Sequence, residues 1–188
     1  MANKNNNIKA LIIGGLNSGK TTFAHYLSDN CSNFTFPLYL PGAGNPVSKT
    51  IIYNNKSYIL NIFDSSGHER YDHIYSILYW DAKIIFIFFD YYSKNSFQRA
   101  KHLFTKVKEQ NKEFYPIIIL IGNKYHEKNF ASFYDEKLNE EEVLEFVQEN
   151  NLLFAHLSVF VKYSNGINEL FDKVLKEYIK KSNINKDI

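Results

Sequence analysis

Residues 14–21 constrain the fold more than any other segment. They read Gly-Gly-Leu-Asn-Ser-Gly-Lys-Thr and match the pattern G-x-x-x-x-G-K-S/T. An apolar run at residues 8–13 precedes them, and a helix is predicted to follow over residues 20–27. A strand, a tight turn and a helix in this order direct backbone N–H groups and a helix N-terminus at one point, where an anion is stabilised. The segment therefore predicts a phosphate-binding loop in an α/β domain.

The residues expected to bind phosphate lie in this loop and in the first turn of its helix: Gly14, Gly15, Leu16, Asn17, Ser18, Gly19, Lys20, Thr21 and Thr22. Lys20 supplies a point charge, and the Thr21 hydroxyl is suited to Mg²⁺. Four fixed positions arise by chance in roughly one chain in a hundred of this length at average composition. We therefore favour a phosphate site over the alternative, a glycine-rich turn with a surface lysine.

The rest of the chain alternates between strand-like and helix-like segments. Residues 83–90 and 116–121 are continuous apolar runs, as expected for strands that are covered on both faces. Residues 49–53 and 57–63 predict a hairpin, and residues 152–157 a shorter strand. With residues 8–13, these segments predict a doubly wound, mostly parallel six-stranded sheet with one antiparallel hairpin at its edge, which is the fold of P-loop NTPases.

Helical periodicity is visible in residues 97–107, 143–147 and 167–179, and the last of these is the clearest. Asn139 and Glu142 predict a capping pair at the start of the second helix. No proline- or glycine-rich linker divides the chain, and 188 residues suit one domain. We expect tails at residues 1–7 and 182–188 around a single domain at residues 8–181.

Composition excludes several classes of protein. The net charge of +2 is too even to indicate a nucleic-acid partner, and the 22 basic residues include only two arginines, Arg70 and Arg99. Cys31 is the single cysteine, which excludes an internal disulfide and a cysteine-rich zinc site. The longest apolar runs are far short of the roughly 18 residues that cross a bilayer.

Two further motifs follow the phosphate loop in order. Residues 64–67 read Asp-Ser-Ser-Gly, which is DxxG, and Asn123 and Lys124 begin NKxD. Together the three motifs resemble the Ras superfamily of small GTPases over nearly the whole chain. Residues 67–71, Gly-His-Glu-Arg-Tyr, are similar to the GQERY of Rab proteins, while the phosphate loop is also similar to that of Arf-like proteins. The Rab family is the most similar.

The resemblance implies roles for the DxxG segment. Asp64 is expected to hold Mg²⁺ through a water molecule, alongside Thr21, and the Gly67 N–H is expected to face the γ-phosphate. His68 stands where most Ras-like proteins carry the glutamine that orients the attacking water; it is either that catalytic group or a solvated loop histidine. Leu16 occupies a position where bulk crowds this water, so we expect slow hydrolysis.

The first switch segment departs from the family pattern. Counting back from Asp64 places Pro41 where the family has a Mg²⁺-ligating threonine. Proline has neither a hydroxyl nor an N–H, so it reproduces neither the metal contact nor the phosphate bond. Thr35, Ser48 and Thr50 are nearby hydroxyls, but each requires a shift of register.

Base recognition departs as well. The resemblance assigns base contacts to Asn123 and Lys124, whereas His126 replaces the aspartate that accepts two hydrogen bonds from guanine. A neutral imidazole has one acceptor nitrogen. Losing two charge-assisted bonds weakens guanine preference by about 3–6 kcal/mol. Glu127 is an alternative carboxylate if the loop shifts.

Two other segments of the base site are expected from the resemblance. Ser158, Val159 and Phe160 lie where the family has the Ser-Ala-Lys loop, and only the serine matches. Phe34 is the candidate for the aromatic residue that packs against the base, with ordinary core packing as its alternative.

The resemblance implies a Mg²⁺-dependent GTP/GDP switch with weak GTPase activity, acting in vesicle or membrane trafficking. Its partners would be a guanine nucleotide, an exchange factor, an activating protein and effectors. Pro41 and His126 favour an alternative, a non-enzymatic pseudo-GTPase interaction module with weakened or altered nucleotide binding. Ala2 replaces the glycine that myristoylation requires, and the last residues lack a prenylatable cysteine. We expect a cytoplasmic monomer, peripheral to an endomembrane only through partners.

Overall fold

The computed structural model describes residues 6–27, 46–111, 116–124, 138–157 and 165–184. Several predicted site residues lie outside these described ranges: Phe34, Pro41, His126, Ser158, Val159 and Phe160.

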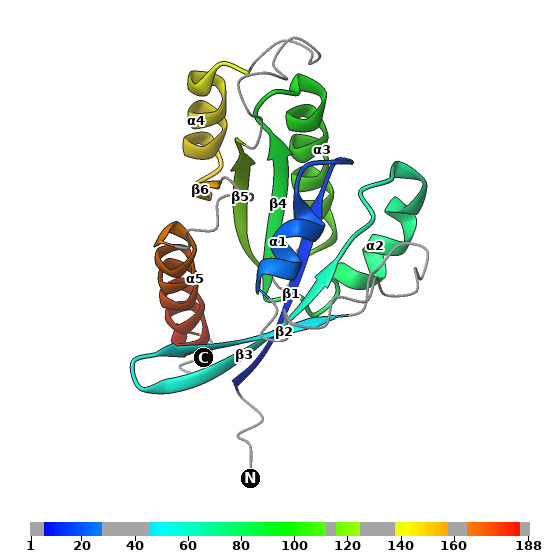
Figure 1. Ribbon diagram of the computed structural model, residues 1–188. Coiled ribbons are helices and arrows are strands. Elements are labelled where there is room, and N and C mark those ends of the chain that lie inside the picture. The colour runs from blue at the N-terminus through cyan, green and yellow to red at the C-terminus, as the bar shows by residue number, and fades with distance from the viewer. Residues whose placement is uncertain (1–5, 28–45, 112–115, 125–137, 158–164, 185–188) are drawn as a thin grey trace.

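The described elements alternate strands and helices along the chain (Figure 1). In order they are β1 (Asn7–Gly14), α1 (Lys20–Leu27), β2 (Val47–Tyr53), β3 (Lys56–Asp64), the 3-10 helix η2 (Glu69–Tyr71), α2 (Asp72–Tyr79), β4 (Ile84–Asp90), α3 (Lys94–Gln110), β5 (Ile117–Asn123), α4 (Glu140–Glu149), β6 (Leu153–Leu157) and α5 (Asn165–Ile184). No helix within the described residues is long and apolar enough to cross a membrane.

The strands form one six-stranded sheet in the order β2-β3-β1-β4-β5-β6. Only β2 runs antiparallel to its neighbour, and it pairs with β3 at the edge of the sheet. The pairs β1–β3, β1–β4, β4–β5 and β5–β6 are all parallel. The predicted fold class is therefore confirmed.

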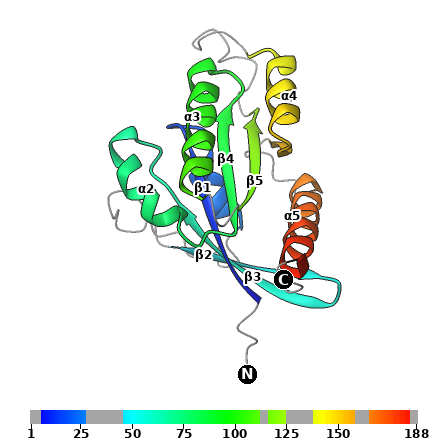
Figure 2. The same cartoon turned by 180° about the vertical axis from the view of Figure 1, so that it is seen from behind.

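Two apolar clusters cover the two faces of this sheet. Helices α1 and α5 pack on one face, and α3 and α4 on the other, together with Tyr79 at the end of α2. Figure 1 shows α1 in front of the sheet, and Figure 2, seen from behind, shows α3 on the opposite side. In β4 the side chains alternate between the clusters, Phe86 and Phe88 facing α1 while Phe89 faces α3. Burial of each such side chain contributes about 1.5–3 kcal/mol.

Helix α2 was not predicted from the sequence. It has only eight residues, although Ile74, Ile77 and Leu78 have helical spacing in its sequence. Its first residue, Asp72, bonds to Arg99 and Lys106 of α3. Tertiary contacts of this kind stabilise a helix that is too short to be stable in isolation.

The predicted capping pair of α4 is half right. Asn139 is the N-cap, and its side-chain oxygen accepts a hydrogen bond from the Glu141 N–H at 3.1 Å. Glu142 is not its reciprocal partner, because the Glu142 carboxylate instead accepts a hydrogen bond from Lys101 of α3 at 3.1 Å. The Glu142 side chain therefore forms an ion pair with α3 and does not complete the cap of α4.

Candidate functional site

The predicted motifs meet at one edge of the sheet because parallel strands end on the same side. The phosphate loop follows β1, Asp64 ends β3, and Asn123 ends β5. Parallel pairing sets Ile12 of β1 opposite Asp64, and the Ser65 N–H donates to the Ile12 carbonyl at 3.0 Å. Ligands of open α/β sheets bind at such carboxyl ends.

The loop backbone requires glycine where it leaves β1. Gly14 has a φ of +150°, and a Cβ there would lie 2.4 Å from the carbonyl oxygen of Phe88. Asn17 also adopts a positive φ, of 56°, a conformation that asparagine tolerates better than most residues. The turn is therefore determined by backbone conformation as much as by side chains.

Lys20 is folded into this loop. Its ammonium donates to the Gly15 carbonyl at 2.5 Å and approaches Ser18 Oγ at 3.4 Å. Ser18 Oγ donates to the same carbonyl at 2.9 Å. Burial lowers the pKa of Lys20 to about 8, against the opposing effect of the Asp64 charge. A bound phosphate would supply the counter-charge that favours the ammonium form.

Thr21 and Asp64, the two predicted Mg²⁺ ligands, are brought together. Thr21 Oγ1 donates to Asp64 Oδ2 at 2.6 Å. The other carboxylate oxygen of Asp64 is buried and has no hydrogen-bond partner among the residues that the structure describes. Burial raises the pKa of Asp64, although the Thr21 bond and the Lys20 charge oppose this shift. A hydroxyl beside a carboxylate oxygen that lacks a donor fits Mg²⁺, which in phosphate sites uses only one or two carboxylates.

Gly67 lies directly against the phosphate loop. Its φ is +78°, and a Cβ there would lie 2.6 Å from Lys20 Nζ and 3.0 Å from the Gly15 carbonyl oxygen. Only glycine fits this position without displacement of the loop. The DxxG segment is therefore in contact with the phosphate loop.

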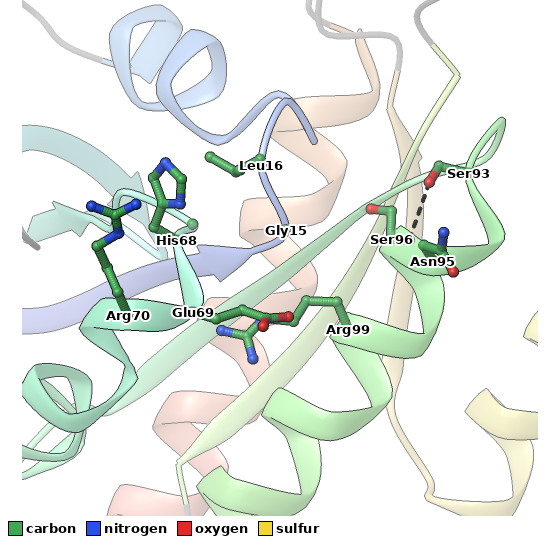
Figure 3. A pocket seen from close by; sticks show the side chains of 10 residues that line it. Gly15, Leu16, His68, Glu69, Arg70, Ser93, Asn95, Ser96 and Arg99 are labelled. Carbon is green, nitrogen blue, oxygen red and sulfur yellow. Dashed lines mark hydrogen bonds between the residues drawn. The ribbon is translucent and has the colours of Figure 1, made fainter. Parts of the chain in front are cut away.

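His68 faces solvent at the rim of a pocket of about 510 Å³ between the phosphate loop, η2 and α3. Figure 3 shows His68 beside Leu16 on one wall, with Ser93, Asn95 and Ser96 on the opposite wall. Leu16 is 50% exposed. The bulky residue that was predicted to crowd the attacking water thus lies next to the residue predicted to orient it.

An ion-pair cluster that the sequence analysis did not predict includes Arg99, which lines this pocket. Arg99 donates to Asp72 through its two terminal guanidinium nitrogens, Nη1 at 2.8 Å and Nη2, and Lys106 donates to the same carboxylate at 2.9 Å. Burial works against the Asp72 charge, but these two cations hold the pKa of its carboxyl below its usual value. The cluster fastens α2, and the DxxG segment that leads into it, to α3. The available signal in the sequence was that arginine is rare: the chain has only two, so each was a candidate for a specific contact.

The described part of the base motif is joined to the phosphate loop. Asn123 is buried, and its side-chain amide donates to the Ser18 carbonyl at 3.2 Å. Lys124 follows, with its ammonium 4.6 Å from the ring centroid of Tyr91 and 3.4 Å from Glu140. The sequence placed Tyr91 near a loop, as a candidate for either a binding patch or ordinary packing, but did not assign it to the base site. The available signal was that Tyr91 directly follows the last residue of an apolar strand, the position where site residues gather in such sheets.

Comparison with known proteins identifies the family. Residues 9–180 match the model of the Ras family. The chain belongs to the Ras family. Ras-related protein Rab-17 of Mus musculus is 26% identical over 181 residues, which covers 93% of this chain and 77% of the relative. Ras-related protein RABF2a of Arabidopsis thaliana is 28% identical over 176 residues, 93% of this chain and 82% of the relative. Ras-related protein Rab-5A of Dictyostelium discoideum is 31% identical over 133 residues, 70% and 61% of the two chains.

These relatives confirm the resemblance to Rab proteins, and the chain is a Rab-like small GTP-binding protein. Within this Ras-family domain, the structure gathers the loop residues with Asp64 and Gly67. Thr22 lies exposed in the first turn of α1. Asn123 is bonded to the loop, and Lys124 follows it at the end of β5.

Proposed function

We propose that the chain is a Mg²⁺-dependent guanine-nucleotide switch that hydrolyses GTP slowly. The observation that carries this proposal is the Thr21–Asp64 pair with its unpartnered carboxylate oxygen, next to a lysine that is folded into the phosphate loop. Ras-family proteins bind GTP and GDP with Mg²⁺, and this chain keeps Lys20, Thr21 and Asp64 for the phosphates and the ion.

In this proposal the loop backbone and Lys20 bind the phosphates, while Thr21 and Asp64 hold Mg²⁺. When bound, the ion neutralises charge on the phosphate oxygens. Gly67 permits the close approach of the DxxG segment to the loop, and His68 orients the attacking water. Leu16 makes hydrolysis slow because it occupies space beside His68.

On the base side, Asn123 and Lys124 contact guanine, with a preference that the His126 substitution weakens. By extension from its Rab relatives, we place the switch in vesicle or membrane trafficking, regulated by an exchange factor and an activating protein and read by effectors. We propose a cytoplasmic monomer whose contact with endomembranes is made through these partners.

Three measurements test the proposal. The ligand that copurifies with the protein is released and its base identified, GDP affinity is measured by calorimetry with and without Mg²⁺, and single-turnover hydrolysis of GTP is followed. We expect bound guanine nucleotide, weaker binding after chelation of Mg²⁺, and slow turnover that falls further in His68→Ala. No binding of GDP or GTP at millimolar concentration would overturn the proposal.

A second candidate is a non-enzymatic module that binds nucleotide weakly or holds it only as a structural ligand. The half-exposed Leu16 beside His68 favours it, together with Pro41 in the sequence. Its signature in the same experiments is bound nucleotide that neither the wild type nor His68→Ala hydrolyses.

A further inference from the structure

The ammonium group of Lys124 is held by two residues that lie outside the nucleotide-binding motifs. It lies 4.6 Å from the centroid of the Tyr91 ring and 3.4 Å from a carboxylate oxygen of Glu140. A cation over an aromatic face and a cation beside a carboxylate are both attractive arrangements. The side chain is thereby fixed at its tip, although it is 42% exposed.

Tyr91 is a rigid platform for this contact. It is buried, its N–H donates to the Asn123 carbonyl at 3.0 Å, and its own carbonyl accepts from the Leu138 N–H at 3.3 Å. Its ring lies so close to Gly122 that a Cβ at that residue would be 2.3 Å from it. Tyr91 therefore joins the end of β5 to the segment that leads into α4.

Glu140 is equally well placed. It is the first residue of α4, directly after the Asn139 cap. Its carboxylate lies 3.2 Å from His156 Nε2 of β6, and the His156 ring stacks on Tyr91 at 5.1 Å. Burial and the Lys124 charge lower the pKa of His156, so near neutral pH the imidazole is an uncharged neighbour of Glu140 and Lys124 is the cation of the cluster.

We infer that Glu140 and Tyr91 are positioning residues for purine recognition: they hold the ammonium of Lys124 so that its aliphatic stem forms a preformed wall of the base site. The inference rests on the proposed nucleotide-binding function. It extends that function to α4 and the end of β4, which no motif assigns to the base. Asn123 is fixed in parallel by the Ser18 carbonyl, so each described base-motif residue has a partner outside the motif.

The chemistry of the Lys124 stem determines which ligands gain affinity from it. An alkyl stem packs against the face of any purine, so the arrangement favours guanine, hypoxanthine and adenine nucleotides alike, and it contributes nothing to a ligand without a base. This separates the positioning role from a general structural role, which would affect the phosphate site too.

The test compares GDP, IDP and inorganic tripolyphosphate by calorimetry on the full chain. Glu140→Gln removes the charge that holds Lys124 while keeping the size of the side chain. We expect GDP and IDP affinity to fall about threefold to fivefold, as is usual for a partly exposed ion pair, with tripolyphosphate affinity unchanged. Glu140→Asp should recover part of the loss. Glu145→Gln, on an exposed position of the same helix, is the matched control and should bind like the wild type.

A second variant tests the aromatic platform. Tyr91→Leu removes the ring and should weaken the binding of GDP and IDP more than that of tripolyphosphate. If Tyr91→Leu does not fold, as judged by its thermal transition, the surface variant Glu140→Gln decides the question.

The outcomes distinguish a failure of the proposed nucleotide-binding function from a failure of the positioning role of Glu140 and Tyr91. If the wild type binds no GDP, the proposed function fails and this inference fails with it. If the wild type binds GDP but Glu140→Gln matches Glu145→Gln, only the inference is overturned. Equal losses for GDP and tripolyphosphate in Glu140→Gln would also overturn it, because they would locate the effect at the phosphates.

Discussion

The phosphate side and the base side of this site are built in different ways. On the phosphate side, the loop backbone after β1 supplies most of the site. Thr21 in the first turn of α1, Asp64 at the end of β3 and Gly67 just after β3 complete it. On the base side, Lys124 is held by Tyr91, which directly follows β4, and by Glu140 of α4. In the base motif, His126 also replaces the aspartate of the family. Backbone amides survive most substitutions because every residue but proline has one, whereas recognition by a carboxylate is lost with one side chain.

His126→Asp is the substitution expected to have the largest effect, because it restores the carboxylate to the base motif. Two charge-assisted hydrogen bonds to guanine are worth about 3–6 kcal/mol, or roughly 10²- to 10⁴-fold in the ratio of GDP to ADP affinity. Competition binding measures this ratio. An unchanged ratio would mean that guanine preference on the base side does not depend on this position.

Asp72→Ala tests whether the phosphate side is independent of α2. The change leaves Arg99 buried without its carboxylate, and we expect the free energy of unfolding to fall by about 3 kcal/mol at neutral pH. Because the partners of Asp72 depress its pKa, this stability is present above the ordinary pKa of aspartate and is lost as the pH falls through the depressed value. Denaturant titrations at several pH values should show wild type and variant converging in acid. Tripolyphosphate affinity should change less than threefold, and a larger change would make α2 part of the phosphate site.

Lys20→Met removes the cation of the phosphate loop. We expect GDP and tripolyphosphate affinity to fall together by about a hundredfold, since a charged hydrogen bond and a point charge on the phosphates are lost. The thermal midpoint should not fall, because a buried ammonium is replaced by an apolar side chain and the Gly15 carbonyl keeps its bond from Ser18. Lys56→Met, at an exposed position in the hairpin, is the control with the same change of charge. A loss confined to GDP would contradict the assignment of Lys20 to the phosphates.

Asp64→Asn is expected to weaken Mg²⁺-dependent GDP binding about tenfold, a typical effect of altering a metal-holding residue. We expect Asp64→Asn to change the free energy of unfolding in the opposite direction to Asp72→Ala. Burial raises the pKa of Asp64, so the folded state disfavours the carboxylate once the pH exceeds the ordinary aspartate value. The variant should therefore be more stable than wild type at neutral pH and equal to it in strong acid. Lower stability at neutral pH would show that the Asp64 charge is well compensated in the fold.

Tyr91→Phe has the smallest expected effect. The Tyr91 hydroxyl is buried without a hydrogen-bond partner among the described residues. Its removal should raise the free energy of unfolding by up to about 1 kcal/mol, because no hydrogen bond is lost. Chemical denaturation measures the change. A loss of stability would reveal a partner for the hydroxyl and make it part of the base side.

Several features were determined by the sequence alone. Continuous apolar runs specified β4 and β5, because strands covered on both faces need no polar positions. The strand-like residues 49–53 and 57–63 specified the hairpin, and Asn54 and Asn55 between them adopt the positive φ of 50° and 59° that such turns require. The glycines and Lys20 specified the phosphate loop, whose function depends on local backbone conformation.

Other features were decided only by the tertiary structure. Helix α2 depends on the contacts of Asp72 with residues of α3 that are 27 and 34 positions away. The grouping of Tyr91, Lys124, Glu140 and His156 joins β4, the end of β5, α4 and β6. Periodicity in a sequence reports which side chains are buried and in which kind of element, but it does not report which distant side chains meet. That choice follows from the order and register of the strands, which the packing of the whole domain sets.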